Sequence, residues 1–176
     1  MSTKFEFKVV VVGDEKVGKT SLIIRYTENR FSESYKQTIG SDIAIKYVHQ
    51  EDKDVNLVLW DIGGQEQYKI MHKYYLQGAQ AAILVYSITD RSSFENIPTW
   101  HNSVLERVGK VPLILLGNKK DLSDQRVVSR DEALALATHL ASDEKIRFFE
   151  TSAKTAEIVE DAFFTLSEML ITQYSS

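Results

Sequence analysis

Three short apolar segments limit the folds that this chain can adopt. They run from Phe7 to Val12, from Ala81 to Tyr86 and from Val111 to Leu116, and they are rich in Val, Ile and Leu. None of them alternates between apolar and polar residues, as a strand with one solvent-facing side would. Strands that are buried on both faces are typical of parallel sheets covered by helices on two sides. The segments therefore predict a parallel sheet inside an α/β fold.

Hairpin and helix patterns occupy the rest of the chain. Ser41 to His49 and Val55 to Trp60 flank Glu51 to Asp54, which predicts a hairpin and one antiparallel edge of the sheet. Ser129 followed by Glu132 has the spacing of a capping box and predicts the start of a helix. A further helical face carries Ile158, Ala162, Leu166, Met169 and Leu170.

Pro98 lies inside the otherwise helical segment Phe94 to Val108 and predicts a kink there. The order of the elements is strand, helix, hairpin and then repeated helix and strand, which predicts a three-layer α/β fold with a mixed sheet. With no linker, repeat or low-complexity stretch, we expect one domain over residues 1–176.

The composition excludes several classes of protein. The 21 basic and 25 acidic residues give a formal net charge of −4, so we expect no nucleic-acid partner. The chain has no cysteine, which excludes thiol catalysis, disulfides and cysteine-linked lipid anchors within these residues. No apolar run approaches the roughly 18 residues of a membrane span. We expect a cytoplasmic protein that reaches a membrane only through a tail or partner not present in this chain.

The residues that follow the first apolar segment, Gly13 to Thr20, read GDEKVGKT and match the phosphate-binding pattern G-x-x-x-x-G-K-[ST]. Ordinary residue frequencies would give this match in roughly 1% of chains of this length, and a glycine-rich turn is the alternative. The position between a predicted strand and an apolar helix favours the functional interpretation, in which backbone N–H groups point at phosphate oxygens. Lys19 would neutralise the outer phosphates, and Thr20 would offer its hydroxyl to magnesium. The predicted contacts are Glu15, Lys16, Val17, Gly18, Lys19, Thr20 and Ser21.

A second motif, GNKKD from Gly117 to Asp121, follows the third apolar segment at the end of a predicted parallel strand, where such folds bind ligands. The carboxylate of Asp121 can accept two hydrogen bonds from the N1–H and the exocyclic amine of guanine, whereas adenine offers no matching pair of donors. Asn118 can bridge loops and meet the N7 side of the purine, and the stem of Lys119 can lie along the ring.

A third motif, ETSAK, begins at Glu150 and would bring a backbone N–H to the guanine carbonyl. Polar turns with Lys and Asp are common, so NKKD gains its weight from its order and position relative to the phosphate loop. The predicted contacts to the base are Asn118, Lys119, Asp121, Ser152, Ala153 and Lys154.

With WDIGGQ at Trp60 to Gln65, these motifs resemble those of the Ras superfamily of small GTPases over almost the whole chain. Among its branches the chain is most similar to the Rab type, because Thr38-Ile39-Gly40 precedes the hairpin and Trp60 precedes Asp61. It departs from that branch in having Ser41-Asp42-Ile43 in place of Val-Asp-Phe, Gln77 in place of arginine, and the pair Gly63-Gly64, which is similar to the Arf group.

The resemblance implies a P-loop NTPase fold with a mixed six-stranded sheet, mostly parallel with one antiparallel edge, and about five helices. It implies that Thr38 binds magnesium and senses the γ-phosphate, and that Asp61 holds magnesium through water. The implied metal ligands are thus Thr20, Thr38 and Asp61.

The resemblance also assigns the chemistry of hydrolysis. Gln65 would orient the attacking water, Lys19 is the second catalytic residue, and Gly64 would donate its N–H to the γ-phosphate. Phe31 would pack on the edge of the guanine, and Tyr35 would also contact the nucleotide.

Three functions are open at this point. The first is a monomeric GTP-hydrolysing switch that uses Mg²⁺ and is read by effectors, with an activating protein and an exchange factor as further partners. The second is a P-loop kinase, which should carry a lid with arginines and an acceptor pocket. The third is a module that binds GTP with negligible hydrolysis.

Glu15 favours the third function, GTP binding with negligible hydrolysis, because relatives have glycine or a small residue at this loop position. We expect its carboxylate to point outward, since a charge about 6 Å from the γ-phosphate would cost roughly 3 kcal/mol at an effective dielectric of 20. Its bulk would still crowd the path of a partner's arginine to the phosphate. We expect Glu15→Gly to raise partner-stimulated hydrolysis more than intrinsic hydrolysis.

Overall fold

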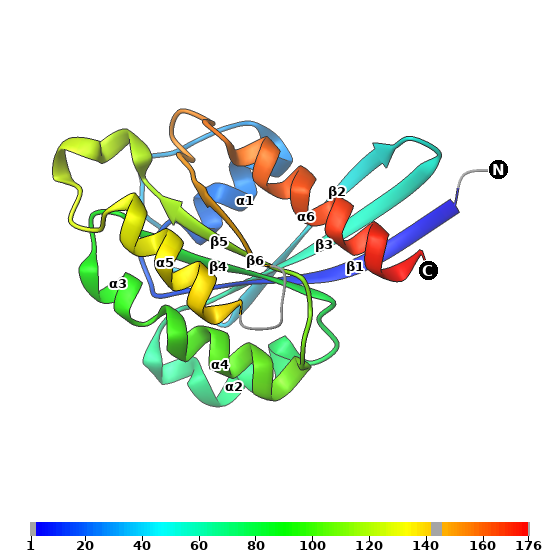
Figure 1. The fold of residues 1–176 in the computed structure, drawn as a ribbon, viewed down its shortest axis with the longest axis horizontal. Coiled ribbons are helices and arrows are strands. Elements are labelled where there is room, and N and C mark those ends of the chain that lie inside the picture. The colour runs from blue at the N-terminus through cyan, green and yellow to red at the C-terminus, as the bar shows by residue number, and fades with distance from the viewer. Residues whose placement is uncertain (1–2, 142–145, 176) are drawn as a thin grey trace.

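The computed structural model describes residues 3–141 and 146–175. Residues 1–2, 142–145 and 176 of the predicted domain lie outside the described residues. Six strands form one sheet in the order β2-β3-β1-β4-β5-β6 (Figure 1). The strands are β1 (Thr3–Val12), β2 (Ser41–Gln50), β3 (Lys53–Ile62), β4 (Ala81–Ser87), β5 (Leu113–Asn118) and β6 (Ile146–Glu150).

The pairing of the strands confirms the predicted mixed sheet. β1 lies parallel to β3 and β4, and β4-β5-β6 continue in parallel. Within the described residues, β2 and β3 form the one antiparallel pair, with Ile43 opposite Trp60. The predicted hairpin is therefore confirmed, and its tight turn places Glu51 at a φ of 55°.

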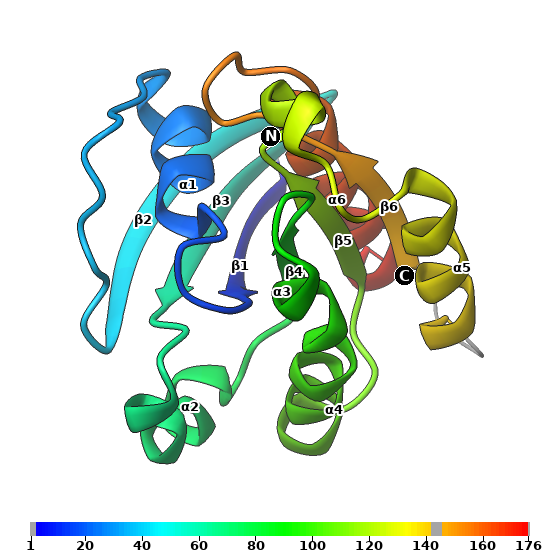
Figure 2. The same ribbon diagram turned by 90° about the vertical axis from the view of Figure 1, so that its left-hand side faces the viewer.

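Helices cover both faces of the sheet, which gives the three layers (Figures 1 and 2). α1 and α6 pack on one face, and α2, α4 and α5 lie on the other. The helices are α1 (Lys19–Glu28), α2 (Lys69–Leu76), α3 (Arg91–Glu95), α4 (Ile97–Val108), α5 (Arg130–Leu140) and α6 (Val159–Tyr174), with short 3-10 turns at Glu66–Tyr68 and Lys120–Gln125.

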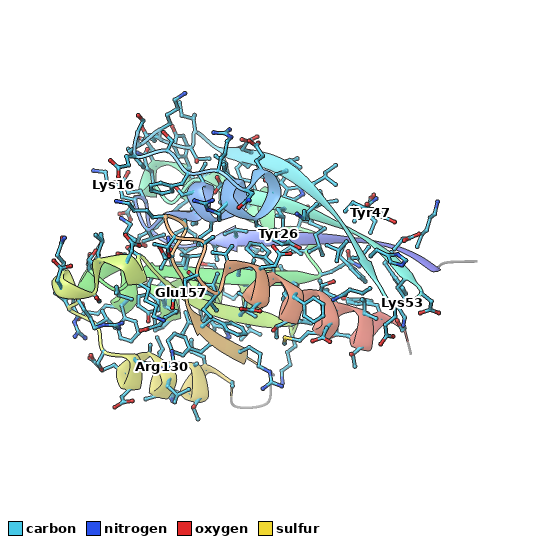
Figure 3. All side chains as sticks on the ribbon, turned by 90° about the horizontal axis from the view of Figure 1, so that it is seen from above. Lys16, Tyr26, Tyr47, Lys53, Arg130 and Glu157 are labelled. Carbon is cyan, nitrogen blue, oxygen red and sulfur yellow. The ribbon has the colours of Figure 1, made fainter. Side chains whose placement is uncertain are left out.

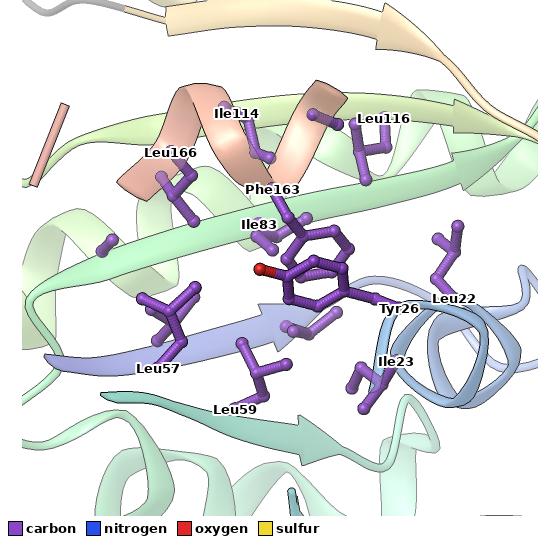
Figure 4. Close-up of a cluster of buried hydrophobic side chains, with 14 of the residues drawn as sticks. Leu22, Ile23, Tyr26, Leu57, Leu59, Ile83, Ile114, Leu116, Phe163 and Leu166 are labelled. Atoms are coloured by element: carbon purple, nitrogen blue, oxygen red, sulfur yellow. The ribbon is translucent and has the colours of Figure 1, made fainter. Parts of the chain in front are cut away.

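Burial on both faces explains the uninterrupted apolar pattern of β1. Val9 and Val11 point into the cluster under α1 and α6, whereas Val10 and Val12 point into the cluster on the other face. In the first cluster, Tyr26 of α1 stacks on Phe163 of α6 with ring centroids 4.0 Å apart (Figure 4). These contacts fix α1, and with it the loop that precedes α1, against the sheet.

The segment with Pro98 differs from its prediction. Instead of one kinked helix, the chain ends α3 at Glu95 and begins α4 at Ile97, with Asn96 as the cap of both. Proline is tolerated in the first turn of a helix, where its missing N–H has no intrahelical partner, so Pro98 starts a helix here. This division gives six α-helices among the described residues, where about five were expected. The predicted capping box of Ser129 and Glu132 is confirmed at the start of α5.

Because β1, β3, β4, β5 and β6 run in parallel, the loops that follow them gather at one edge of the sheet. Figure 3 shows Lys16 after β1 and Glu157 after β6 toward this end, while Tyr47 and Lys53 of the hairpin lie at the opposite end. In the part of the chain that the structure describes, no helix is both long and apolar enough to cross a membrane.

Candidate nucleotide-binding site

A cavity of about 790 Å³ opens at this edge of the sheet, between the loops after β1, β3, β5 and β6 and the segment before β2. Three predicted site residues are buried and do not line it: Val17, Asp61 and Ser152. The predicted residues that line it are Glu15, Lys16, Gly18, Lys19, Thr20, Ser21, Phe31, Tyr35, Thr38, Gly64, Gln65, Asn118, Lys119, Asp121, Ala153 and Lys154.

The loop after β1 has the backbone that a phosphate loop needs. Gly18 caps α1 with a φ of 97°, and a Cβ on it would lie 2.3 Å from Nδ2 of Asn118, so only glycine fits. α1 begins directly afterwards, and its first residues, Lys19 to Ser21, line the cavity. The N–H groups of a first helical turn have no intrahelical partner and attract anions.

Lys19 is a buried cation at this cavity. Its Nζ donates hydrogen bonds to the carbonyl oxygens of Gly13 (2.8 Å) and Asp14 (2.7 Å). Burial lowers the pKa of Lys19 to about 8, against the opposing attraction of Asp61, Asp14 and Glu15. An anionic ligand beside Nζ would stabilise the charged ammonium, so this lysine favours anion binding.

Oxygen-bearing side chains from three segments meet beside the helix. Oγ1 of Thr20 lies 2.8 Å from Oγ1 of Thr38, and both hydroxyls donate to Oδ2 of Asp61. The second oxygen, Oδ1 of Asp61, is buried without a hydrogen-bond partner among residues 3–141 and 146–175. Burial raises the pKa of Asp61, and the Thr20 hydroxyl and Lys19 oppose that rise. An unpartnered carboxylate oxygen beside two hydroxyls fits Mg²⁺, which prefers oxygen ligands.

Asn118 connects three loops around the cavity, and its predicted bridging role is confirmed. Its Nδ2 donates to the carbonyl oxygen of Val17 at 3.0 Å. Its Oδ1 accepts from the hydroxyl of Thr151 (3.2 Å) and from the backbone N–H of Ala153 (3.4 Å). Because Asn118 is 1% exposed, these bonds are shielded from water and hold the loops together.

Two further residues of the second motif connect the loops. Oδ1 of Asp121 accepts a hydrogen bond from the hydroxyl of the buried Ser152 at 2.7 Å, which orients the carboxylate. Nζ of Lys119 donates to the carbonyl oxygen of Lys16 at 2.6 Å, so the stem of Lys119 crosses from the base side to the phosphate loop.

Sequence reasoning missed two arginines that support the third motif. Arg126 forms a two-bonded ion pair with Glu150, at 2.6 and 2.9 Å, where β6 ends. Arg25 of α1 donates to the carbonyl oxygens of Ala153 (2.8 Å) and Lys154 (2.9 Å). Their partners lie far along the chain or on the backbone, so no local pattern marks them.

The loop from Gly63 to Gln65 lies directly against the phosphate loop. A Cβ on Gly64 would lie 2.4 Å from the carbonyl oxygen of Gly13 and 2.5 Å from the backbone nitrogen of Glu15. The N–H of Gly63 donates to the carbonyl oxygen of Gly40 at 2.8 Å, which ties this loop to the segment before β2. Glycine is needed at position 64 because the two backbones touch.

Asp14 connects the phosphate loop to α4, a contact that sequence reasoning also missed. Its carboxylate accepts from Nε1 of Trp100 (2.8 Å) and from Nδ2 of Asn96 (2.7 Å). The ring of Trp100 lies 5.1 Å from that of His72 in α2, and Nε2 of His72 lies 2.9 Å from the carbonyl oxygen of Gly63. The phosphate loop and the Gly63 loop thus share an anchor on α4.

Glu15 is exposed, and its Oε2 accepts a hydrogen bond from Nε2 of Gln65 at 2.9 Å. Burial and then the charge of Glu15 raise the pKa of Tyr35, a residue that is 55% exposed and lines the cavity. Phe31, by contrast, is half-buried and packs against the core under α1. Glu15 therefore lies at the rim, between residues of both neighbouring loops.

The fold and the site define a P-loop nucleotide-binding protein. Residues 8–172 match the Ras family model, and the chain belongs to the Ras family of small GTPases. It is 45% identical to the Ras-related protein Rab-13 of Rattus norvegicus over 94% of this chain and 80% of that protein. It is 39% identical to Rab-8B of Homo sapiens, over 95% of this chain and 79% of the relative. The GTP-binding protein ypt2 of Schizosaccharomyces pombe is 39% identical, over 98% and 86% respectively.

Proposed function

We propose that this Ras-family protein is a Rab-type switch that binds GTP, hydrolyses it to GDP and phosphate, and changes its surface between the two states. The observation that supports this most is the convergence on one cavity of about 790 Å³ of a phosphate loop, an oxygen-rich metal site and an oriented carboxylate. A nucleotide needs these three elements together.

Base recognition falls to Asp121, with Ser152 holding its carboxylate in place through the 2.7 Å hydrogen bond. The carboxylate would accept from the two donors of guanine, and Asn118 would face the N7 side. The backbone N–H of Ala153, now in a long 3.4 Å hydrogen bond to Asn118, would turn to the guanine carbonyl. Lys119 covers the ring with its stem, because Nζ is already bound to the phosphate loop.

Phosphate binding falls to the backbone of residues 15–21 and to Lys19. The nucleotide would take over the hydrogen bonds that Nζ now makes to Gly13 and Asp14. Thr20, Thr38 and Asp61 would hold Mg²⁺, which supplies positive charge at the phosphate oxygens when bound. Thr38 comes from a different segment than Thr20, so its contact makes the metal site sensitive to the conformation of residues 30–40.

Hydrolysis falls to Gln65, which would orient the attacking water, and to Lys19, which would stabilise charge on the transferring phosphate. Arg30 is the one arginine among the described residues that line the cavity, and its Nε is paired with Glu28 at 2.5 Å. Because no other arginine of residues 3–141 and 146–175 lines the cavity, the protein should turn over slowly and use an arginine from an activating partner.

The switch itself would consist of residues 30–40 and the Gly63–Gln65 loop. Residues 30–40 form no helix or strand, and Tyr35 and Ile39 are 55% and 72% exposed. GTP would order both segments through Thr38 and Gly64, and effectors would bind that ordered surface. An exchange factor would restart the cycle, in a monomeric protein that serves vesicle trafficking.

The binding part of this proposal is tested by identifying the nucleotide carried through purification and by titrating GTP, GDP and ATP. We expect guanine nucleotide and submicromolar affinity for GTP and GDP only. Lys19→Ala and Thr20→Asn should impair triphosphate binding, because they remove a phosphate contact and a magnesium ligand. Equal affinity for ATP and GTP would contradict the base assignment.

The hydrolytic part is tested by single-turnover GTP hydrolysis with Gln65→Leu, which should bind GTP normally and hydrolyse it at least tenfold more slowly. Gln173→Leu, which changes an exposed glutamine in the last turn of α6 and outside the residues that line the cavity, is the matched control. A second candidate, a GTP-binding module with negligible hydrolysis, is favoured by the bond from Gln65 to Glu15. Native turnover no faster than in Gln65→Leu would select that candidate.

A further inference from the structure

The amide of Gln65 is held by protein partners at both of its ends. Its Nε2 donates to Oε2 of Glu15 at 2.9 Å, and its Oε1 accepts from Nε2 of Gln67 at 2.7 Å. A residue that orients water needs its carbonyl oxygen directed at that water and its amide hydrogens directed at phosphate. The observed orientation of the amide is therefore set by Glu15 and Gln67.

The position of Gln67 shows toward which cavity the carbonyl oxygen of Gln65 is held. Glu15 and Gln65 line both the nucleotide cavity and a second cavity of about 520 Å³ beside α4, whereas Gln67 lines only the second. The hydrogen bond from Gln67 therefore directs the oxygen of Gln65 toward the second cavity. In this conformation both polar atoms of the Gln65 amide are engaged by protein partners, Nε2 by Glu15 and Oε1 by Gln67, and not by a water or a phosphate.

The close packing of the two loops places the side chain of Gln65 within hydrogen-bonding reach of Glu15. Gly64 packs against the backbone of Asp14 and Glu15, with distances of 2.5 Å from a built Cβ to both residues. Gln65 is the next residue, so its side chain reaches Glu15 without movement of either loop. A small residue at position 15 would leave the amide of Gln65 without this acceptor.

We propose that Glu15 is a positioning residue that latches Gln65 away from the attacking water and so slows intrinsic hydrolysis. The inference rests on the proposed function, in which Gln65 orients that water. Releasing a partly exposed hydrogen bond to a carboxylate corresponds to about a three- to tenfold change in rate. Glu15→Ala should therefore raise the single-turnover rate by about three- to tenfold and leave GTP affinity within about twofold.

A double-mutant cycle separates the latch from a direct effect of the Glu15 charge on phosphate. Single-turnover rates are measured for the native protein, Glu15→Ala, Gln65→Leu and the double variant, each loaded with GTP and magnesium. If Glu15 acts through Gln65, Glu15→Ala accelerates only the protein that retains Gln65. Glu15→Gln keeps an acceptor oxygen and removes the charge, so it should restore part of the slow native rate.

A spectroscopic readout follows the contact itself. In the GDP-bound protein, the side-chain amide resonance of Gln65, assigned by its loss in Gln65→Leu, should shift in Glu15→Ala. Glu28→Ala, which removes another exposed acid, should leave that resonance in place.

The proposal would be wrong if Glu15→Ala changed the rate equally in the native protein and in the Gln65→Leu variant, or if Glu15→Ala did not accelerate hydrolysis. An unshifted Gln65 amide would do the same. Failure of the proposed function would be recognised differently. Weak GTP binding, or an unchanged rate in the single variant Gln65→Leu, would show that Gln65 does not orient the water, whatever Glu15 does.

Discussion

The base side and the switch side of the cavity are built in different ways. On the base side, Asn118, Thr151 and Ser152 are at most 1% exposed and bonded across three loops. On the switch side, residues 30–40 lack regular structure, and the contacts with the Gly63 loop are few and partly exposed. The base side is thus held together by hydrogen bonds within the protein, whereas the switch side has few such bonds, as the proposed switch requires.

This difference assigns separate tasks to the two sides. A network that is buried and bonded before the ligand arrives loses little entropy on binding, which favours affinity and selectivity. A segment with few buried contacts opens at low free energy, so a phosphate group with its magnesium can shift its population. Substitutions on the base side should therefore change which ligand binds, and substitutions on the switch side should change what the ligand does.

The largest effect is expected for Asp121→Asn. Two hydrogen bonds from guanine to a carboxylate contribute about 1.5–3 kcal/mol each, so GTP affinity should fall by roughly 100- to 10,000-fold. The asparagine should accept xanthosine triphosphate, whose extra carbonyl matches the amide. Isothermal titration with both nucleotides measures this exchange, and GTP affinity within threefold of native would contradict the assignment.

The next effect concerns the support of the base side. Arg126→Ala leaves Glu150 buried without its partner, and we expect a loss of about 2–3 kcal/mol in the free energy of unfolding, together with weaker GDP binding. Lys69→Ala removes an ion pair whose two side chains are 59% and 85% exposed, and it should leave the free energy of unfolding nearly unchanged. Urea denaturation of both variants measures the difference, and equal losses would show that the pair at Glu150 has no special weight.

The motifs of the base side and of the phosphate loop can be found in the sequence because each of them is contiguous. Residues 13–20 follow β1 directly and run into α1, and residues 117–121 begin in the last residues of β5, so each motif holds its loop and contacts in a few consecutive positions. The mixed, mostly parallel sheet follows from the buried strand patterns and the hairpin. The hydrogen bonds of Asp14 to Trp100 and of Glu15 to Gln65 join residues 86 and 50 positions apart. Nothing local marks such pairs, because they depend on how helices dock after the sheet has formed.

The helix break at Asn96 shows a different limit of sequence reasoning. The apolar spacing before and after Pro98 is compatible with one kinked helix or with two helices. Two helices form because α3 has its own N-terminal cap and is only 5 residues long. The cap is Asp90, whose carboxylate accepts from the N–H groups of Ser92 and Ser93. At the break, Nδ2 of Asn96 donates a hydrogen bond of 2.7 Å to the carboxylate of Asp14 in the phosphate loop. The break therefore contributes to the structure of the site.

On the switch side, Thr38→Ala should leave GDP affinity near native and abolish the ordering by GTP. Its hydroxyl lies 2.8 Å from that of Thr20 and 3.3 Å from Asp61, so its loss removes one link between residues 30–40 and the metal site. Hydrogen exchange over residues 31–40 in the GTP state should rise by about tenfold, to the level of the GDP state. Thr27→Ala, which removes a hydroxyl bonded to Ile23 within α1, should not alter the difference between the two states.

The smallest effect is expected from His72, the titratable anchor of the Gly63 loop. Burial lowers the pKa of His72 below its usual 6.5, and Lys19 and Lys69 lower it further, while the carbonyl of Gly63 opposes the shift. The unfolded or opened segment therefore takes up a proton near pH 6.5 before the closed one does, so the closed state has its full stability above that pH and loses stability as the pH falls below it.

Acidification should therefore open the switch side while the base side stays closed. We expect exchange of residues 63–76, corrected for its intrinsic pH dependence, to rise by about two- to fivefold between pH 7.5 and 5.5, with residues 117–121 unchanged. His72→Gln keeps an amide donor for Gly63 without the titration and should abolish the rise, whereas His139→Gln on the exposed face of α5 should preserve it. A rise of the same size in His72→Gln would place the acid sensitivity elsewhere on the switch side, and a rise shared by residues 117–121 would show that the two sides open together.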